Sequence, residues 1–67
     1  MIQPGRYKHF KSGEYEVIGI ARHSETLEDM VMYQNLESNE IWVRPAKMWE
    51  EMVEYNGEEV KRFTKID

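Results

Sequence analysis

Residues 14–23 read EYEVIGIARH and contain the longest strand-like run of this 67-residue chain. Alternate residues of a strand point to opposite faces, and here both faces are apolar in the middle of the run. A strand that is buried on both sides of a small barrel, and bent between its two layers, has this pattern. Gly19 is the expected position of the bend or bulge, because a residue without a side chain relieves crowding at a corner. We therefore predict a long, bent strand at the centre of a small β barrel.

Turn-forming residues interrupt the chain at short intervals on both sides of this strand. Short apolar runs separated by such turns are typical of an all-β barrel or sandwich. Asn56-Gly57 is the strongest turn signal, because both residues tolerate the positive φ angles of a type I′ turn. It predicts a closing hairpin whose last strand, from Val60 to about Thr64, returns beside the first strand. The other turn signals are Pro4-Gly5, Ser12-Gly13, Ser24–Asp29 and Glu37–Glu40.

One segment, residues 45–53 with the sequence PAKMWEEMV, predicts a short helix. Proline suits the first helical position, where its missing N–H costs nothing. The apolar residues Met48, Trp49, Met52 and Val53 form a single stripe at helical spacing. So short a helix is marginal alone in water, so we expect this stripe to dock on an open end of the barrel.

The composition indicates one small domain over residues 1–67. The chain carries a formal net charge of −4 and no cysteine. An acidic chain is a poor candidate for binding duplex nucleic acid, because that affinity comes largely from neutralising phosphates. The N-terminus has no apolar core of a leader peptide, and no apolar run reaches membrane-spanning length. We expect a cytoplasmic protein that does not associate with membranes.

Basic residues near the two ends suggest one exception to the acidic character. If the first and last strands pair, these residues form one basic edge. Protection of an edge strand by lysine is the simpler explanation, and a nucleic-acid accessory role is the alternative. The residues are Arg6, Lys8, Lys11, Lys61, Arg62 and Lys65.

The order of these residues resembles a known bacterial family, the domain of unknown function 1653. The most specific pieces are Gly5-Arg6-Tyr7, Glu14-Tyr15, Ala21-Arg22-His23-Ser24-Glu25-Thr26 and Trp42-Val43-Arg44-Pro45. The similarity covers about residues 5–63 of the 67. It implies a small SH3-type β barrel of about five antiparallel strands with one short helix, near residues 45–53. It implies no activity, because the role of the family is unassigned.

The segment Arg22-His23-Ser24-Glu25-Thr26 is the candidate functional site, because it places five polar side chains where a hairpin needs only a turn. His23 and Glu25 project to the same side of an extended chain, as half of an acid–base pair does. Arg44 ends a neighbouring run, and a guanidinium there suits a carboxylate or phosphate ligand. The predicted ligand-binding residues are Arg22, His23, Glu25, Thr26, Trp42 and Arg44.

A purely structural explanation of the same segment is open. Ser24, Glu25 and Thr26 can cap backbone N–H groups of their own turn. His23 can hydrogen-bond a carbonyl at a strand end, and either arginine can pair with Glu25 or Glu28. The two histidines, His9 and His23, lack the spacing of a metal-binding pair, so we expect no metal site and no cofactor.

The sequence therefore favours a non-catalytic binding module. Its predicted partner is a small anionic molecule or a protein segment, bound near Arg22–Thr26 and Arg44. The alternatives are a small enzyme that uses His23 and Glu25 as an acid–base pair, and the nucleic-acid accessory module. No catalytic residue is assigned.

Overall fold

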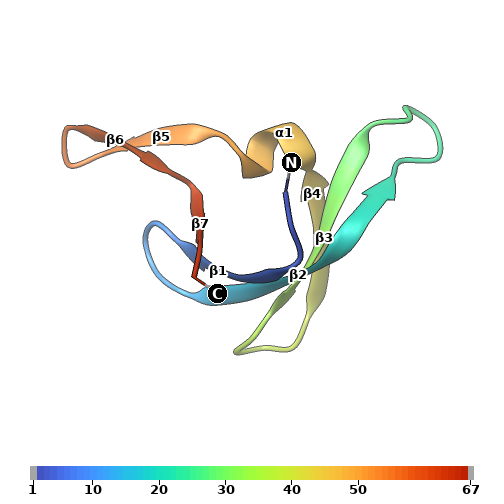
Figure 1. The fold of residues 1–67 in the computed structure, drawn as a ribbon, viewed down its shortest axis with the longest axis horizontal. Helices are drawn as coiled ribbons and strands as arrows, with labels where there is room; N and C mark the ends of the chain where they lie inside the picture. The colour runs from blue at the N-terminus through green and yellow to red at the C-terminus, as the bar shows by residue number, and fades with distance from the viewer. Residues whose placement is uncertain (1, 67) are drawn as a thin grey trace.

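A curved, five-stranded antiparallel sheet forms most of the molecule (Figure 1). The structure is a computed structural model and describes residues 2–66. The strand order is β4-β3-β2-β1-β7, so the last strand pairs with the first, as predicted. The strands are β1 (Gly5–His9), β2 (Glu14–Arg22), β3 (Asp29–Asn35), β4 (Ile41–Pro45) and β7 (Phe63–Lys65).

A β-bulge divides the long strand β2 at the expected place. The pairing with β3 shifts register between Val17 and Gly19, so Ile18 has no partner of its own. Cross-strand partners share a face of the sheet. Val17 pairs with buried Tyr33, and Ile20 pairs with buried Val31. Val17 and Ile20 therefore both face the core side, although they are three positions apart and simple alternation would place them on opposite faces. The bulge thus changes which residues of β2 point inward.

Two predictions about β2 are wrong. The strand is not buried on both sides, because Ile18 on its outer side is exposed. Gly19 does not relieve crowding either, since a Cβ at this position meets no atom within 4 Å. The bulge follows from the strand pairing, and not from a lack of space.

The helix α1 spans only Ala46–Trp49, which is shorter than the predicted residues 45–53. Pro45 precedes it as the N-cap residue. The helix ends where Glu51 bonds to Arg62. The Glu51 carbonyl accepts a hydrogen bond from the Arg62 N–H at 3.1 Å, and the Glu51 carboxylate pairs with the Arg62 guanidinium at 2.8 Å. The predicted apolar stripe therefore breaks up, and Met52 begins the next strand.

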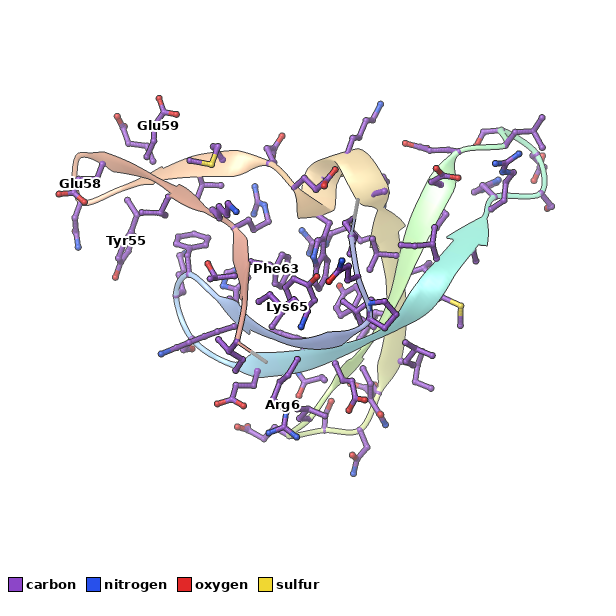
Figure 2. All side chains as sticks on the ribbon, in the orientation of Figure 1. Arg6, Tyr55, Glu58, Glu59, Phe63 and Lys65 are labelled. Atoms are coloured by element: carbon purple, nitrogen blue, oxygen red, sulfur yellow. The ribbon has the colours of Figure 1, made fainter. Side chains whose placement is uncertain are left out.

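The closing hairpin consists of β5 (Met52–Tyr55) and β6 (Glu58–Lys61), which pair only with each other. Asn56 and Gly57 connect them with φ angles of 54° and 80°, as the type I′ turn requires. Figure 1 shows this hairpin projecting beyond β7, and Figure 2 shows Tyr55, Glu58 and Glu59 near its tip. The Asn56-Gly57 hairpin is confirmed, but the single last strand predicted from Val60 to about Thr64 is divided at Arg62. The hairpin strand β6 pairs with β5, and only β7 pairs with β1.

The core lies on the concave face of the sheet, under α1. Trp49 is 2% exposed and stacks on Phe63, with ring centroids 3.7 Å apart and planes inclined by 2°. Tyr7 meets the indole edge-on at 5.4 Å. The docking of the helix through Trp49 is confirmed. The buried residues are Ile2, Tyr7, Val17, Val31, Tyr33, Trp49 and Phe63.

The fold is all-β with one short helix, as predicted, but the sheet does not close into a barrel. Within residues 2–66, β4 and β7 are the two edges of the sheet and do not pair with each other. The convex face carries exposed apolar side chains of Ile18, Ile41 and Val43. No helix among these residues is long and apolar enough to cross a membrane.

Candidate functional site

The loop between β2 and β3 is organised by the His23 ring. Its Nδ1 accepts hydrogen bonds from the backbone N–H of Glu25 at 3.1 Å and of Thr26 at 3.3 Å. The backbone of His23 bonds to Glu28 and Leu27 at the base of the loop. The imidazole thus accepts hydrogen bonds from the backbone of its own turn. The structural explanation had the opposite direction, with the ring donating a hydrogen bond to a carbonyl at a strand end.

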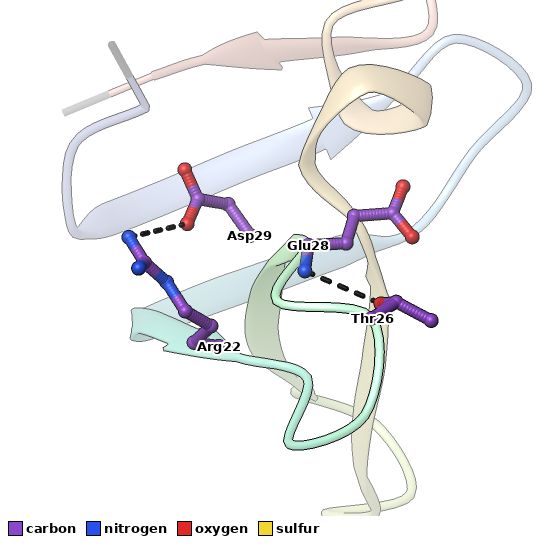
Figure 3. A network of polar contacts seen from close by, with 4 residues as sticks. All are labelled: Arg22, Thr26, Glu28 and Asp29. Atoms are coloured by element: carbon purple, nitrogen blue, oxygen red, sulfur yellow. Dashed lines mark hydrogen bonds and ion pairs between the residues drawn. The ribbon is translucent and has the colours of Figure 1, made fainter.

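Thr26 also serves the turn, as Figure 3 shows. Its Oγ1 accepts a hydrogen bond from the Glu28 N–H at 3.2 Å. Glu28 in turn lies 3.8 Å from the Lys47 ammonium group at the start of α1. The capping role expected for the threonine is present.

Arg22 is paired across the sheet with Asp29, at the end of the β2–β3 ladder (Figure 3). The guanidinium and carboxylate lie 3.7 Å apart, and their side chains are 66% and 59% exposed. The ion pair is therefore well solvated and contributes little to stability. Its partner is Asp29, and not the glutamates considered from the sequence.

Arg44 and Trp42 lie on β4, away from the loop. Arg44 pairs with Val31, so its side chain points to the concave face, where the guanidinium lies 5.7 Å from the centre of the Phe63 ring. Trp42 is 50% exposed. The structure brings Arg22 and the turn residues His23, Glu25 and Thr26 together, and holds Trp42 and Arg44 apart from them.

Arg22 also lines an open groove of about 530 Å³ on the concave side. The floor is apolar and includes Ile20, which is 44% exposed although it faces the same side as the core. The sequence reasoning missed Ile20, because simple alternation assigns it to the face opposite Val17. A bulge at Gly19 is the signal that reverses this assignment. The groove is lined by Ile2, Ile20, Ala21, Arg22, Asp29, Ala46 and Glu50.

Cations surround His9 near the other end of the concave face. Partial burial, followed by the positive charges of Arg62, Arg44 and Lys11, lowers the pKa of His9 below its ordinary value. The ring packs edge-on against Phe63 at 5.0 Å. The histidine is therefore held in its neutral form more strongly than a solvated imidazole.

The basic residues of the two ends are not on one surface. Tyr7 pairs with Lys65, so this lysine is on the concave side, whereas Arg6 is on the convex side. Figure 2 shows the Lys65 and Arg6 side chains on opposite sides of the sheet. The ends pair as expected, but they do not form one basic edge. No group of three His, Cys, Asp or Glu side chains among residues 2–66 is placed to hold a metal ion.

Comparison with known proteins agrees with the resemblance seen in the sequence. The model of the family described as protein of unknown function (DUF1653) matches residues 5–65. The fold is similar to a crystal structure of a protein of this family from Bordetella bronchiseptica, with a TM-score of 0.89. The two chains are 31% identical, and the alignment covers 97% of this chain and 87% of the other. No curated protein matches this chain.

Proposed function

This chain belongs to the DUF1653 family, and from that premise and the geometry above we propose that it is a non-catalytic module that binds a segment of another protein. The observation that carries the proposal is Ile20, a large apolar side chain left 44% exposed on the floor of an open groove. Covering such a side chain contributes favourably to binding, because apolar surface is removed from water. We place the proposed partner in this groove, beside Arg22.

The charges at the groove favour a polypeptide over a small anion. Arg22 supplies one positive charge, whereas Asp29 and Glu50 supply negative ones. A small anion at Arg22 meets repulsion from Asp29, which already lies 3.7 Å from the guanidinium. A polypeptide carries side chains of both signs and an apolar side chain for the floor, so it complements all three features.

The predicted site residues have different roles in this proposal. Arg22 contacts the partner, while His23, Glu25 and Thr26 fix the end of the strand that carries it. Trp42 and Arg44 do not line this groove, so the proposal assigns them no contact with the partner. An acid–base role for His23 is disfavoured, because a proton on Nδ1 would abolish its hydrogen bonds to Glu25 and Thr26. The absence of cysteine supports a cytoplasmic location as part of the same proposal.

Two isoleucines in the same strand provide a matched test. Ile20 lies on the groove floor, and Ile18 has a similar exposure but lies on the convex side. Peptides selected from a random library on the full chain are titrated into the ¹⁵N-labelled protein. We expect amide shifts at Ile20, Arg22 and Ala46, a clear loss of affinity in Ile20→Ser, and unchanged affinity in Ile18→Ser.

The proposed function would be contradicted if the selection returned no peptide that prefers the natural chain to the Ile20→Ser chain. It would also be contradicted if the amide shifts fell on the convex face, or if the two serine variants lost affinity equally, because an equal loss would indicate a general effect on folding.

A further inference from the structure

One edge of the sheet lacks the features that usually prevent strands of different molecules from pairing. The edge strand β7 is three residues long and includes a lysine, and both features discourage such pairing. The opposite edge strand, β4, is five residues long and begins with three consecutive exposed apolar residues, Ile41, Trp42 and Val43. Its ladder with β3 contains no bulge, and no strand of residues 2–66 pairs with its outer side.

The ladder between β3 and β4 decides which backbone groups point to this open edge. Opposite residues of an antiparallel ladder alternate between hydrogen-bonded and non-hydrogen-bonded pairs. The Asn35 N–H donates to the Glu40 carbonyl at 2.9 Å, so the pair just before β4 is hydrogen-bonded. By alternation, the N–H and C=O groups of Ile41 and Val43 point away from β3, to the open edge. The strand of another chain offers the matching row of donors and acceptors.

The sequence at this edge is complementary to itself in the antiparallel direction. The segment Glu40–Arg44 reads EIWVR, with an acidic and a basic end, two aliphatic residues and a central aromatic one. In a pair of such segments centred on Trp42, Glu40 of each copy lies opposite Arg44 of the other. Ile41 lies opposite Val43 in the same way. Opposite charges and apolar side chains at facing positions stabilise a sheet, and a two-fold contact requires this self-complementarity.

Two further observations favour the register centred on Trp42. Arg44 forms no ion pair within residues 2–66, so its guanidinium is available to a carboxylate of another chain. In the neighbouring register, centred on Val43, Ile41 would lie opposite Pro45 of the other copy. Proline has no N–H to donate, so one hydrogen bond of each such pair would be lost.

We propose that two copies of this chain form a dimer by antiparallel pairing of their β4 strands, which joins the two sheets into one. Ile41 and Val43 exchange backbone hydrogen bonds across the two-fold axis, and the two Trp42 side chains face each other on the concave side. Ion pairs between Glu40 and Arg44 flank this centre. The contact is small, so the dimer is weak and its population rises with protein concentration. The contact is separate from the peptide groove, which no residue of β4 lines.

Hydrogen exchange of single amides tests the pairing directly. The exchange rates of the natural chain are measured by NMR from micromolar to millimolar concentration, and sedimentation velocity measures the dimer in the same samples. We expect the N–H groups of Ile41 and Val43 to become protected as the dimer forms. The Trp42 N–H points to β3 in both states, so it is the internal reference and is expected to change much less.

Charge reversal tests the register. Glu40→Arg places like charges at both ends of the contact and is expected to weaken dimerisation about tenfold. The Glu40 side chain is exposed, and the hydrogen bonds of this residue to Asn35 and Ser38 use its backbone, so the variant keeps them. The double variant Glu40→Arg/Arg44→Glu restores opposite charges at both ends. It is expected to recover the natural affinity to within about threefold.

Ile18→Ser is the matched control. Ile18 is exposed on the convex face, as Ile41 and Val43 are, but it belongs to the central strand β2. Pairing at the β4 edge does not involve this residue, so the variant is expected to dimerise as the natural chain does. None of these measurements depends on the peptide groove, which the amides of Ile20 and Arg22 report.

The proposal is overturned if the natural chain stays monomeric at millimolar concentration, or if dimers form while the N–H groups of Ile41 and Val43 exchange freely. It is overturned equally if a folded double variant stays monomeric, or if Ile18→Ser weakens dimerisation as much as Glu40→Arg, which would indicate packing between convex faces. Protection of these N–H groups by a library peptide alone would also overturn it and would assign the edge to a foreign strand. The exchange measurement decides the outcome if the double variant does not fold.

Discussion

His23 shows how one side chain is committed to local structure in a loop that has the composition of a site. Its Nδ1 replaces the missing partners of two backbone N–H groups, those of Glu25 and Thr26. Unpaired N–H groups in a turn are otherwise left to solvent. The polar character of residues 22–26 thus has a structural cause, and only Arg22 among them reaches the groove.

Substitution of His23 tests whether its ring stabilises the loop. His23→Ala removes the acceptor and is expected to lower the free energy of unfolding by about 1 kcal/mol. His23→Asn is expected to retain most of the stability, because the asparagine Oδ1 occupies the position of Nδ1. Urea unfolding of the three proteins measures the difference. Equal losses in both variants would show that the hydrogen bonds to the ring do not stabilise the loop.

At the scale of the element, the register of β2 decides the character of the concave face. The extra residue at Ile18 moves Ile20 from the outer to the inner side of the sheet. The groove floor exists for this reason. The β5–β6 hairpin, in contrast, depends on a local feature, the positive φ angles of Asn56 and Gly57.

Alanine substitution at two glycines compares the Asn56-Gly57 turn, which needs positive φ angles, with the bulge of β2 at Gly19, which depends on strand pairing. Gly57→Ala is expected to destabilise the protein by about 1–2 kcal/mol, because its φ of 80° is unfavourable for a residue with a Cβ. Gly19→Ala is expected to change stability by no more than about 0.5 kcal/mol, since its Cβ has open space. Thermal or urea unfolding compares them. A larger loss at Gly19 than at Gly57 contradicts the prediction.

At the scale of the molecule, the aromatic stack connects parts of the chain that are distant in sequence. Trp49 comes from the helix and Phe63 from the last strand, and Tyr7 of the first strand packs against the indole. A domain of 67 residues has a total stability of about 3–10 kcal/mol. One large core side chain is therefore a substantial part of the whole.

Truncation of Trp49 tests this dependence. Trp49→Ala is expected to cost about 3–5 kcal/mol and to leave a large fraction of the chain unfolded at 25 °C. Trp49→Phe keeps an aromatic ring on Phe63 and is expected to remain folded with reduced stability. Circular dichroism during urea titration measures both. A native-like unfolding midpoint for the alanine variant would mean that the stack is not central to the core.

The sequence by itself determined the features that depend on neighbouring residues: the all-β class, most of the turns, the Asn56-Gly57 hairpin and the family. It also identified Arg22 as a candidate binding residue. The tertiary structure decided the rest, because those features depend on pairing between distant segments. The bonds between Glu51 and Arg62 end the helix, the register against β3 turns Ile20 inward, and Trp49 is buried in a stack on Phe63. No local pattern contains these contacts, so the proposed peptide groove became visible only in the folded chain.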